Sequence, residues 1–296
     1  MTLVDSWRNS HLAEIMTGGV ITIRSNASLY EAQKLLTGSK LTRIVVTDRS
    51  GKLEGIITRR DLVRFLTQDK TGRPLNAMRV KEAMTSPVVT LRPADTLGES
   101  ARLMNKKGIS SIVITDKKEQ VLGIVTKTDL CFHYSLFPTN EKVSDYMTRK
   151  IFKVSPMHSI FLVSSILARH GISRVPVVDI KLRGMITLSD IVRTSPTMRP
   201  EFTQPSEQGE YSKSPLGAIA KLTAMTAADI MTPETITISP DEPLSHAADL
   251  MIEHRISGLP VIDSKGRVQG IITKTDIVRA IAARPPPLKP TPKPLG

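Results

Sequence analysis

The heptapeptides GIITRRD, residues 55–61, and GIITKTD, residues 270–276, differ at only two polar positions although they lie near opposite ends of the chain. Two relatives stand between them, GIVTKTD at 123–129 and GMITLSD at 184–190. The pattern Gly-apolar-apolar-Thr-x-x-Asp therefore occurs four times. Repetition of one pattern along a chain predicts a fold that is built from repeated units.

A constant spacing ties each heptapeptide to a Met-Thr pair. The glycine follows the methionine by 39, 39, 37 and 39 residues in the four copies, whose methionines are Met16, Met84, Met147 and Met231. Between these anchors come a β-branched run, a stretch with helical periodicity such as SLYEAQKLL, and a second apolar run that ends in Asp. Turn residues such as RSGK then predict a hairpin.

Each copy therefore predicts the order strand, helix, strand, strand, helix. A small sheet with two helices cannot bury both of its faces alone. Pairing copy one with two and copy three with four would bury them, which predicts two modules.

These motifs, four times in register, resemble those of the CBS-domain family over residues 10–68, 78–136, 141–196 and 225–283. The resemblance implies an α+β fold of four CBS repeats that pair into two Bateman modules. The layout is similar to that of the γ subunit of AMP-activated protein kinase. It implies a regulatory protein that holds an adenine nucleotide (AMP, ADP or ATP) in clefts between paired repeats and signals its occupancy to a partner protein.

Two segments fall outside the repeats. Residues 197–224 form an inserted linker that is rich in Pro and Ser before it becomes helix-like. Residues 284–296 form a basic, Pro-rich tail that is not expected to pack.

The chemistry of Thr-x-x-Asp suits a nucleotide. A threonine at the end of a strand and the start of a helix places a hydroxyl beside free backbone N–H groups, which favour a phosphate. A carboxylate three residues later can accept a forked pair of hydrogen bonds from the vicinal hydroxyls of a ribose. In the family, the corresponding threonine contacts phosphate and the aspartate contacts ribose. The resemblance therefore predicts the following ligand residues: Thr58, Asp61, Thr126, Asp129, Thr187, Asp190, Thr273 and Asp276.

The same motif has a purely structural interpretation. Thr-x-x-Asp resembles a capping box, in which the threonine side chain bonds the third backbone N–H and the acid reaches back. The two interpretations are compatible. A capping role would also accept Glu or Gln, so four aspartates favour an additional geometric demand.

The positive charge that a phosphate needs is unevenly distributed among the repeats. In the family, basic contacts often come from the Ser/Thr-x pair before the second strand, which reads Thr42-Arg43, Ser110-Ser111, Ser173-Arg174 and Ser257-Gly258. Arg43 and Arg174 are therefore the primary phosphate candidates, and copies two and four could borrow them within a pair. The histidine that the γ subunit has at the Ser position is absent. Secondary candidates are Arg59, Arg60, Lys127 and Lys274.

An enzymatic function is not expected. The chain has no phosphate-binding Gly-rich loop, no His-Glu-x-x-His and a single cysteine. His246 and His254 lack a partner at metal-ligand spacing and are expected to have surface or capping roles, and Cys131 on an apolar helix face is expected to be a buried small hydrophobe. The sequence therefore predicts no cofactor, no metal site and no catalytic residue.

Composition narrows the class of partner. The net charge is +13, with the surplus mainly in residues 1–79 and 142–200, so RNA or DNA binding is the alternative function. Basic residues are not interleaved with aromatic ones, which weakens that alternative. The absence of a signal-peptide pattern and of a long apolar run predicts a cytoplasmic protein without a membrane partner. The identity of the regulated protein and the formation of a homodimer stay open.

Overall fold

The computed structural model describes residues 7–38, 41–69, 71, 73–137, 140–194 and 225–283. Contacts divide the chain into two compact units, Met1–Pro138 with Ile277–Gly296 and Thr139–Asp276. Repeats one and two lie in the first unit and form the first module. Repeat three and repeat four up to Asp276 lie in the second unit and form the second module, whereas the rest of α13 from Ile277 is grouped with the first unit. Each module is described separately. The predicted linker at 197–224 and tail at 284–296 lie outside the described residues.

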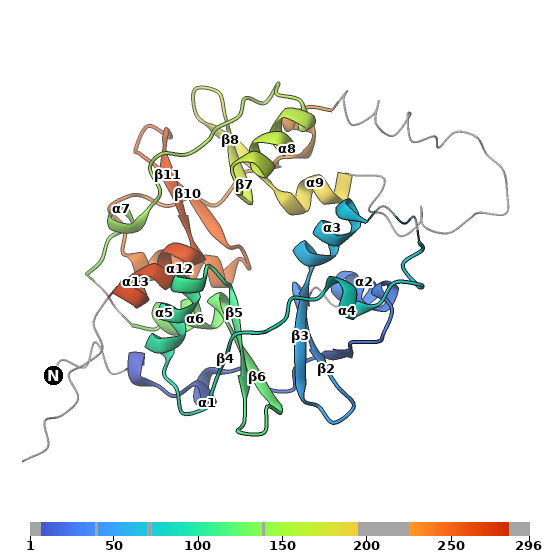
Figure 1. Ribbon diagram of the computed structural model, residues 1–296. Coiled ribbons are helices and arrows are strands. Elements are labelled where there is room, and N and C mark those ends of the chain that lie inside the picture. Colours follow the sequence, from blue (N-terminus) through green and yellow to red (C-terminus); the bar gives the residue numbers. More distant parts are fainter. Residues whose placement is uncertain are drawn as a thin grey trace, which may run out of the picture. The chain divides into compact units, whose positions relative to one another are not determined.

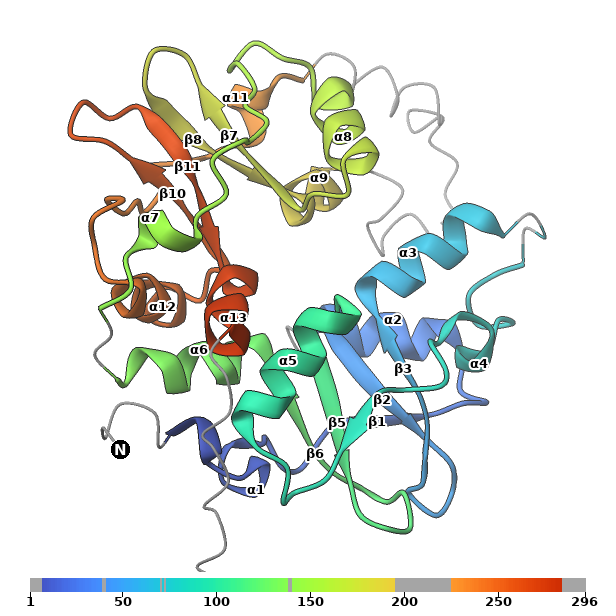
Figure 2. The same ribbon diagram turned by 60° about the vertical axis from the view of Figure 1, so that its left-hand side comes forward.

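The first module contains two copies of one element order (Figures 1 and 2). Repeat one has α1 (Leu12–Ile15), β1 (Thr22–Arg24), α2 (Leu29–Gly38), β2 (Arg43–Thr47), β3 (Leu53–Thr58) and α3 (Arg59–Gln68). Repeat two has α4 (Val80–Ala83), β4 (Thr90–Leu91), α5 (Leu97–Lys107), β5 (Ser111–Thr115), β6 (Val121–Thr126) and α6 (Lys127–Ser135). The predicted order is present, preceded in each repeat by a one-turn helix that the sequence patterns did not predict.

The second module follows the same plan. Repeat three has α7 (Val143–Tyr146), α8 (Ile160–Arg169), β7 (Arg174–Val178), β8 (Leu182–Thr187) and α9 (Leu188–Thr194). Repeat four has α11 (Ala227–Ile230), β9 (Thr232–Pro233), α12 (Leu244–Glu253), β10 (Gly258–Ile262), β11 (Val268–Thr273) and α13 (Lys274–Ala283).

The first predicted strand of repeats three and four is reduced to a single bridge. In repeat one, β1 pairs in parallel with β2 from Thr22 opposite Val45 onward. In repeats three and four only Val154 bridges Val177 and only Ile238 bridges Val261. The position of Val45 is occupied there by Pro176 and Pro260, as the hairpin registers show. Because proline has no N–H to donate, the ladder is shortened.

The Met-Thr segment of each repeat packs on the other repeat of its module. Leu12 and Ala13 donate backbone hydrogen bonds to Asp95 and Pro93, and Val80 donates to Ala27. A Cβ added to the glycine that opens each heptapeptide would meet the methionine of the partner repeat, in the pairs Gly55–Met84, Gly123–Met16, Gly184–Met231 and Gly270–Met147. The segments are therefore exchanged within each module, which explains why repeat one pairs with two and three with four.

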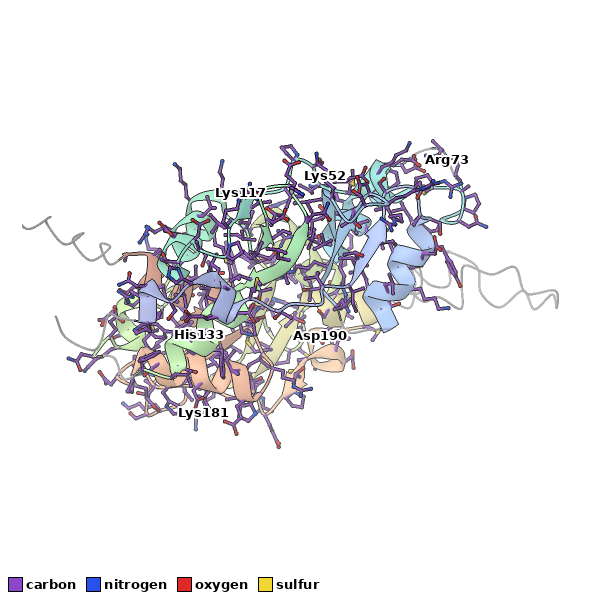
Figure 3. All side chains as sticks on the ribbon, turned by 90° about the horizontal axis from the view of Figure 1, so that it is seen from below. Lys52, Arg73, Lys117, His133, Lys181 and Asp190 are labelled. Atoms are coloured by element: carbon purple, nitrogen blue, oxygen red, sulfur yellow. The ribbon has the colours of Figure 1, made fainter. Side chains whose placement is uncertain are left out.

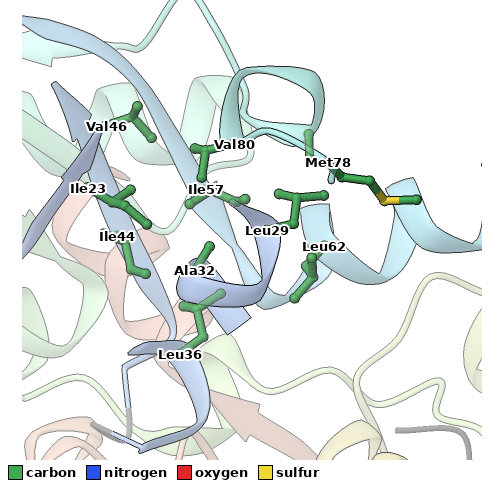
Figure 4. Packing of buried hydrophobic residues seen from close by; sticks show 11 residues of the cluster. Ile23, Leu29, Ala32, Leu36, Ile44, Val46, Ile57, Leu62, Met78 and Val80 are labelled. Atoms are coloured by element: carbon green, nitrogen blue, oxygen red, sulfur yellow. The ribbon is translucent and has the colours of Figure 1, made fainter. Parts of the chain in front are cut away.

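The aliphatic cores contain residues from both repeats of a module (Figure 4). In the first module, Leu29 and Ile57 of repeat one are fully buried with Val80 of repeat two. In the second module, Ala227, Ile230 and Met231 of repeat four belong to the core cluster of repeat three. Neither repeat can therefore bury its core without its partner.

The two hairpins of the first module also meet. Lys52 bridges Gln120, and the Leu53 N–H donates to the Glu119 carbonyl at 3.0 Å. The Lys52 Nζ lies 2.8 Å from Glu119 Oε2, and Lys52 is labelled in Figure 3. None of the helices in the described part of the chain has the length and apolar character required to cross a membrane.

Candidate functional site

All four Thr-x-x-Asp motifs form the same local structure at a strand-to-helix junction. The Asp Oδ2 accepts hydrogen bonds from both the backbone N–H and the hydroxyl of the threonine. The N–H distances are 3.0, 2.7, 2.8 and 2.8 Å, and the hydroxyl distances are 2.5, 2.8, 2.6 and 2.7 Å, in the pairs Thr58–Asp61, Thr126–Asp129, Thr187–Asp190 and Thr273–Asp276. The acid therefore reaches back to the threonine in every repeat, and in repeats one and two the threonine hydroxyl also accepts the Asp N–H, which completes the capping box.

This capping geometry leaves Oδ1 as the carboxylate oxygen that can face a ligand. Asp61, Asp190 and Asp276 are only 7%, 6% and 4% exposed, whereas Asp129 is half-buried. The Asp190 side chain is labelled in Figure 3. The expected fork that uses both oxygens would require the capping box to open, because Oδ2 already accepts two hydrogen bonds.

The Ser/Thr-x pair lies beside the helix start in each repeat. The carbonyl oxygens of Thr42, Ser110, Ser173 and Ser257 accept the backbone N–H of the first helical residue, at 3.3, 3.1, 3.0 and 3.2 Å. The residue after each of them stands opposite the motif threonine in the hairpin, in the pairs Arg43–Thr58, Ser111–Thr126, Arg174–Thr187 and Gly258–Thr273. Two sequence motifs about fifteen residues apart therefore form one continuous polar edge.

Arg43 reaches from this edge of repeat one toward repeat two. Its Nη1 donates to the Ser110 carbonyl oxygen at 2.9 Å, and its Nε donates to Thr42 Oγ1 at 3.3 Å. Burial lowers the pKa of the Arg43 guanidinium, and the negative charge of Asp129 opposes that change. The guanidinium of repeat one therefore lies within electrostatic reach of the motif carboxylate of repeat two.

Arg174 repeats this arrangement in the second module. Its Nη2 donates to Ser257 Oγ at 2.5 Å. Burial lowers the pKa of the Arg174 guanidinium, and Asp276 of repeat four opposes that change. A Cβ added to Gly258 would lie 2.7 Å from Arg174 Nη1, so the absence of a side chain at Gly258 makes room for this guanidinium.

The two motif carboxylates of each module consequently have different surroundings. Asp129 and Asp276 face an arginine from the partner repeat. The partner residue at the equivalent position is Ser111 for Asp61 and Gly258 for Asp190. Asp61 Oδ1 instead accepts from Arg64 Nη2 at 2.8 Å and from Thr85 Oγ1 at 3.3 Å.

Thr85 is a site residue that the sequence interpretation did not include. It belongs to the Met-Thr pair of repeat two, yet its hydroxyl contacts the motif carboxylate of repeat one. The exchange of segments produces this contact, because Thr85 bridges Ile56 on the strand that ends at Thr58. The sequence feature that could have indicated this contact is the regular spacing between the four methionines and the four glycines. That spacing does not tell which methionine packs against which glycine.

The secondary basic candidates differ in their surroundings. Arg59 Nε and Nη2 both donate to the Leu36 carbonyl oxygen, at 3.2 and 2.6 Å, near the end of α2. That bond directs Arg59 toward its own repeat. Arg60 is exposed, and Lys127 and Lys274 are half-buried.

The histidines and the cysteine have the environments expected of them. His246 Nδ1 lies 2.5 Å from Glu242 Oε2 on an exposed face, and His254 Nε2 lies 3.8 Å from Glu253. Cys131 is fully buried. Among the described residues, no group of three His, Cys, Asp or Glu side chains could hold a metal ion.

Comparison with known proteins identifies the repeats. The sequence model of the CBS domain matches residues 12–68, 80–135, 143–196 and 227–283. Protein MJ1225 of Methanocaldococcus jannaschii is 25% identical over 277 residues, which are 89% of this chain and 95% of that protein. Its crystal structure, that of a protein proposed as an archaeal homologue of the AMP-activated protein kinase γ subunit, covers 92% of this chain and 100% of that chain, with 24% identity and a TM-score of 0.75.

Two further solved structures are similar. A conserved protein of Pyrococcus horikoshii has 21% identity and a TM-score of 0.64 over 92% of this chain and 99% of that chain. The CBS domain pair of protein MJ0100, in complex with 5′-methylthioadenosine and S-adenosyl-L-methionine, is 31% identical over 49% of this chain and 98% of that chain, with a TM-score of 0.38.

Proposed function

The chain belongs to the CBS-domain family, and from that premise we propose that it is a regulatory protein that binds adenine nucleotides (AMP, ADP or ATP) between the paired repeats of each module. Its occupancy would be signalled to a partner protein. The ligand residues would come from the four strand-to-helix junctions and the neighbouring Ser/Thr-x pairs.

The observation that carries this proposal is that Arg43 lies within electrostatic reach of Asp129, and Arg174 within electrostatic reach of Asp276. In each module a guanidinium of one repeat stands close to the motif carboxylate of the other, beside a helix N-terminus. A guanidinium can bind a phosphate with two parallel hydrogen bonds. The carboxylate Oδ1 can accept a ribose hydroxyl. The two groups together match the two polar parts of a nucleotide.

The two strand-to-helix junctions of each module differ in whether an arginine of the partner repeat lies nearby, which suggests that they bind different ligands. The sides that contain Asp129 and Asp276 would take phosphorylated ligands, because each has an arginine from the partner repeat. The sides that contain Asp61 and Asp190 have Ser111 and Gly258 at that position and would favour ligands with less phosphate charge. Each module would then bind one phosphorylated nucleotide more tightly than a second.

The exchanged segments offer a route by which occupancy could reach the rest of the module. Asp61 of repeat one contacts Thr85, which begins the segment that leads into the sheet of repeat two. A ligand hydroxyl that competes for Asp61 Oδ1 would displace Thr85 or Arg64. That displacement would alter the packing of the paired repeats.

Isothermal titration calorimetry with AMP, ADP, ATP and adenosine tests the proposal, with guanine nucleotides and S-adenosylmethionine as controls. We expect saturable binding of adenine nucleotides in the micromolar range. A ligand at a hundredfold excess over Kd should also stabilise the native state by about 2.7 kcal/mol. Absence of both heat and competition at millimolar concentration would contradict the proposal. Binding of nucleic acid with a steep loss of affinity in salt would instead support the alternative function.

A further inference from the structure

A cavity of about 170 Å³ lies in the first module, away from the strand-to-helix junctions. It is lined by the start of β3, by the segment that follows Thr85, and by the end of β5, and its walls include Leu53, Glu54, Pro87, Thr90, Arg92 and Thr115. Glu54 precedes Thr58 by four residues of one strand, which corresponds to about 13 Å at about 3.3 Å per residue. We call this space the hairpin cavity.

The wall of the hairpin cavity contains a carboxylate oxygen without a donor. Glu54 Oε2 is buried and has no hydrogen-bond partner among the described residues. Buried polar atoms in folded proteins nearly always have a partner. A positively charged group in the cavity would offset the charge of this carboxylate.

The same wall contains a fixed cation with spare donors. Arg92 Nη1 donates to the Thr115 carbonyl oxygen at 3.1 Å, to Thr115 Oγ1 at 2.9 Å, and to the Asp116 carbonyl oxygen. These bonds hold the guanidinium at the end of β5. Its Nε and Nη2 donate no hydrogen bond within the described ranges, so they can donate to a carboxylate in the fork geometry that arginine favours.

The fold does not require this pair of charges. Glu54 stands just before the heptapeptide glycine of its repeat, and Arg92 stands at the end of the first strand of the partner repeat. The residues at these two positions in the other three pairings of a repeat with its partner are Leu122 with Arg24, Arg183 with Ser239, and Gln269 with Ser155. An acid and an arginine occur together in one combination of the four. The pair Glu54 and Arg92 is therefore a feature of this cavity rather than of the repeat.

We propose that the hairpin cavity binds a small zwitterion of the α-amino-acid type. Its ammonium group would pair with the Glu54 carboxylate, and its carboxylate would accept from Arg92. The hydroxyl of Thr90 offers a further polar contact, and Leu53 and Pro87 provide an apolar wall for a short side chain. The cavity volume of about 170 Å³ is several times the roughly 30 Å³ that one water molecule occupies in the liquid, which suits a ligand of this size.

Calorimetry of the full chain with the proteinogenic amino acids, one at a time at millimolar concentration, tests the site. Ethylamine and propionate, each with one of the two charges, serve as half-ligands. We expect saturable binding of at least one small amino acid and much weaker binding of both half-ligands. Failure of every amino acid to bind would overturn the proposal, and ethylamine binding as tightly as the amino acid would show an ammonium site instead.

Two variants assign the binding to the cavity. Glu54→Gln keeps the shape and removes the charge, so affinity for the amino acid should fall about ten- to hundredfold. Glu99→Gln is the matched control, because Glu99 is exposed at the start of α5, does not line the cavity, and stands in a capping box that glutamine also suits. Its effect should stay below about fivefold. Unchanged affinity in Glu54→Gln would refute the site, whereas ATP binding should be equal in both variants and thus reports separately on the nucleotide sites.

Discussion

The carbonyl oxygen of Thr148 lies so close to Gly270 that a Cβ on the glycine would be 2.6 Å from it. Thr148 belongs to repeat three and Gly270 to repeat four. Thr148 is joined to Ile271, the residue after Gly270, through reciprocal backbone hydrogen bonds: the Thr148 N–H donates to the Ile271 carbonyl oxygen at 2.9 Å, and the Ile271 N–H donates to the Thr148 carbonyl oxygen at 3.0 Å. The glycine is therefore required by the exchange of segments, not by a turn.

Gly270→Ala should destabilise the second module. The added methyl group would meet a backbone atom that cannot move without breaking the bridge to Ile271, so we expect a loss of about 1–3 kcal/mol in the free energy of unfolding. Urea denaturation measures this loss. Gly18→Ala is the control, because a Cβ there would meet nothing within 4 Å. Equal stability of the two variants would contradict the exchanged packing.

Asp276→Ala should weaken nucleotide binding by about 1.5–3 kcal/mol, because it removes a charged acceptor that faces Arg174. The substitution also removes a helix cap, which costs about 0.5–2 kcal/mol of stability. Asp229→Ala separates the two effects, since Thr226 and Asp229 form the same capping box at the start of α11, where Asp229 is exposed. Calorimetry and thermal unfolding of both variants should show affinity loss only in the first.

The same comparison applies to Asp61, Asp129 and Asp190, each of which should weaken one site. Should all four substitutions lower the melting temperature while nucleotide affinity stays unchanged, the motif has only its capping role.

Arg174→Lys should weaken ADP and ATP binding more than adenosine binding. Lysine keeps the charge but cannot form the two parallel hydrogen bonds of a guanidinium to phosphate, and adenosine has no phosphate to lose. The ratio of the two affinities, measured by calorimetry, is the diagnostic quantity. Arg169→Lys on the exposed end of α8 is the control. Equal losses for adenosine and ATP would mean that Arg174 shapes the site without contacting phosphate.

His133 should report on the charge of Asp129. Burial lowers the pKa of His133, and the charges of Asp129 and Glu14 oppose that change. Asp129→Asn should therefore lower the pKa of His133 further, as measured by NMR titration of its imidazole protons. Asp61→Asn, in the other repeat, should leave it unchanged. An unchanged His133 pKa in the Asp129→Asn variant would show that the two side chains do not face each other.

The pH dependence of stability has a definite sign at His133. Its pKa in the folded state lies below the ordinary value of 6.5, so the folded state binds this proton less readily than the unfolded state. The contribution of His133 to stability is therefore fully present above pH 6.5 and declines as the pH falls below that value. Asp129→Asn should make this decline larger, which urea denaturation between pH 5 and pH 8 would reveal.

The sequence alone determined the features that depend on neighbours along the chain. The four repeats, their strand and helix order, the hairpins and the Thr–Asp hydrogen bonds of the four motifs could all be predicted, because each rests on hydrogen bonds or side-chain periodicity within a few residues. Thr58 and Asp61, three residues apart, form their hydrogen bonds in any fold that keeps the strand-to-helix junction. The prediction of a full first strand in repeats three and four was wrong, because each forms only a single bridge. Pro176 and Pro260 in the neighbouring strands could have indicated this from the sequence.

Only the tertiary structure decided which repeat each segment packs on. Met16 has the same sequence relation to Gly55 that Met84 has to Gly123, yet Met16 packs against Gly123 and Met84 against Gly55. Spacing cannot distinguish packing within a repeat from packing between repeats, because both use the same residues. The approach of Arg43 to Asp129 and of Thr85 to Asp61 follows from that exchange. The site is consequently a property of the pair of repeats, set by the burial of aliphatic side chains that neither repeat can complete alone.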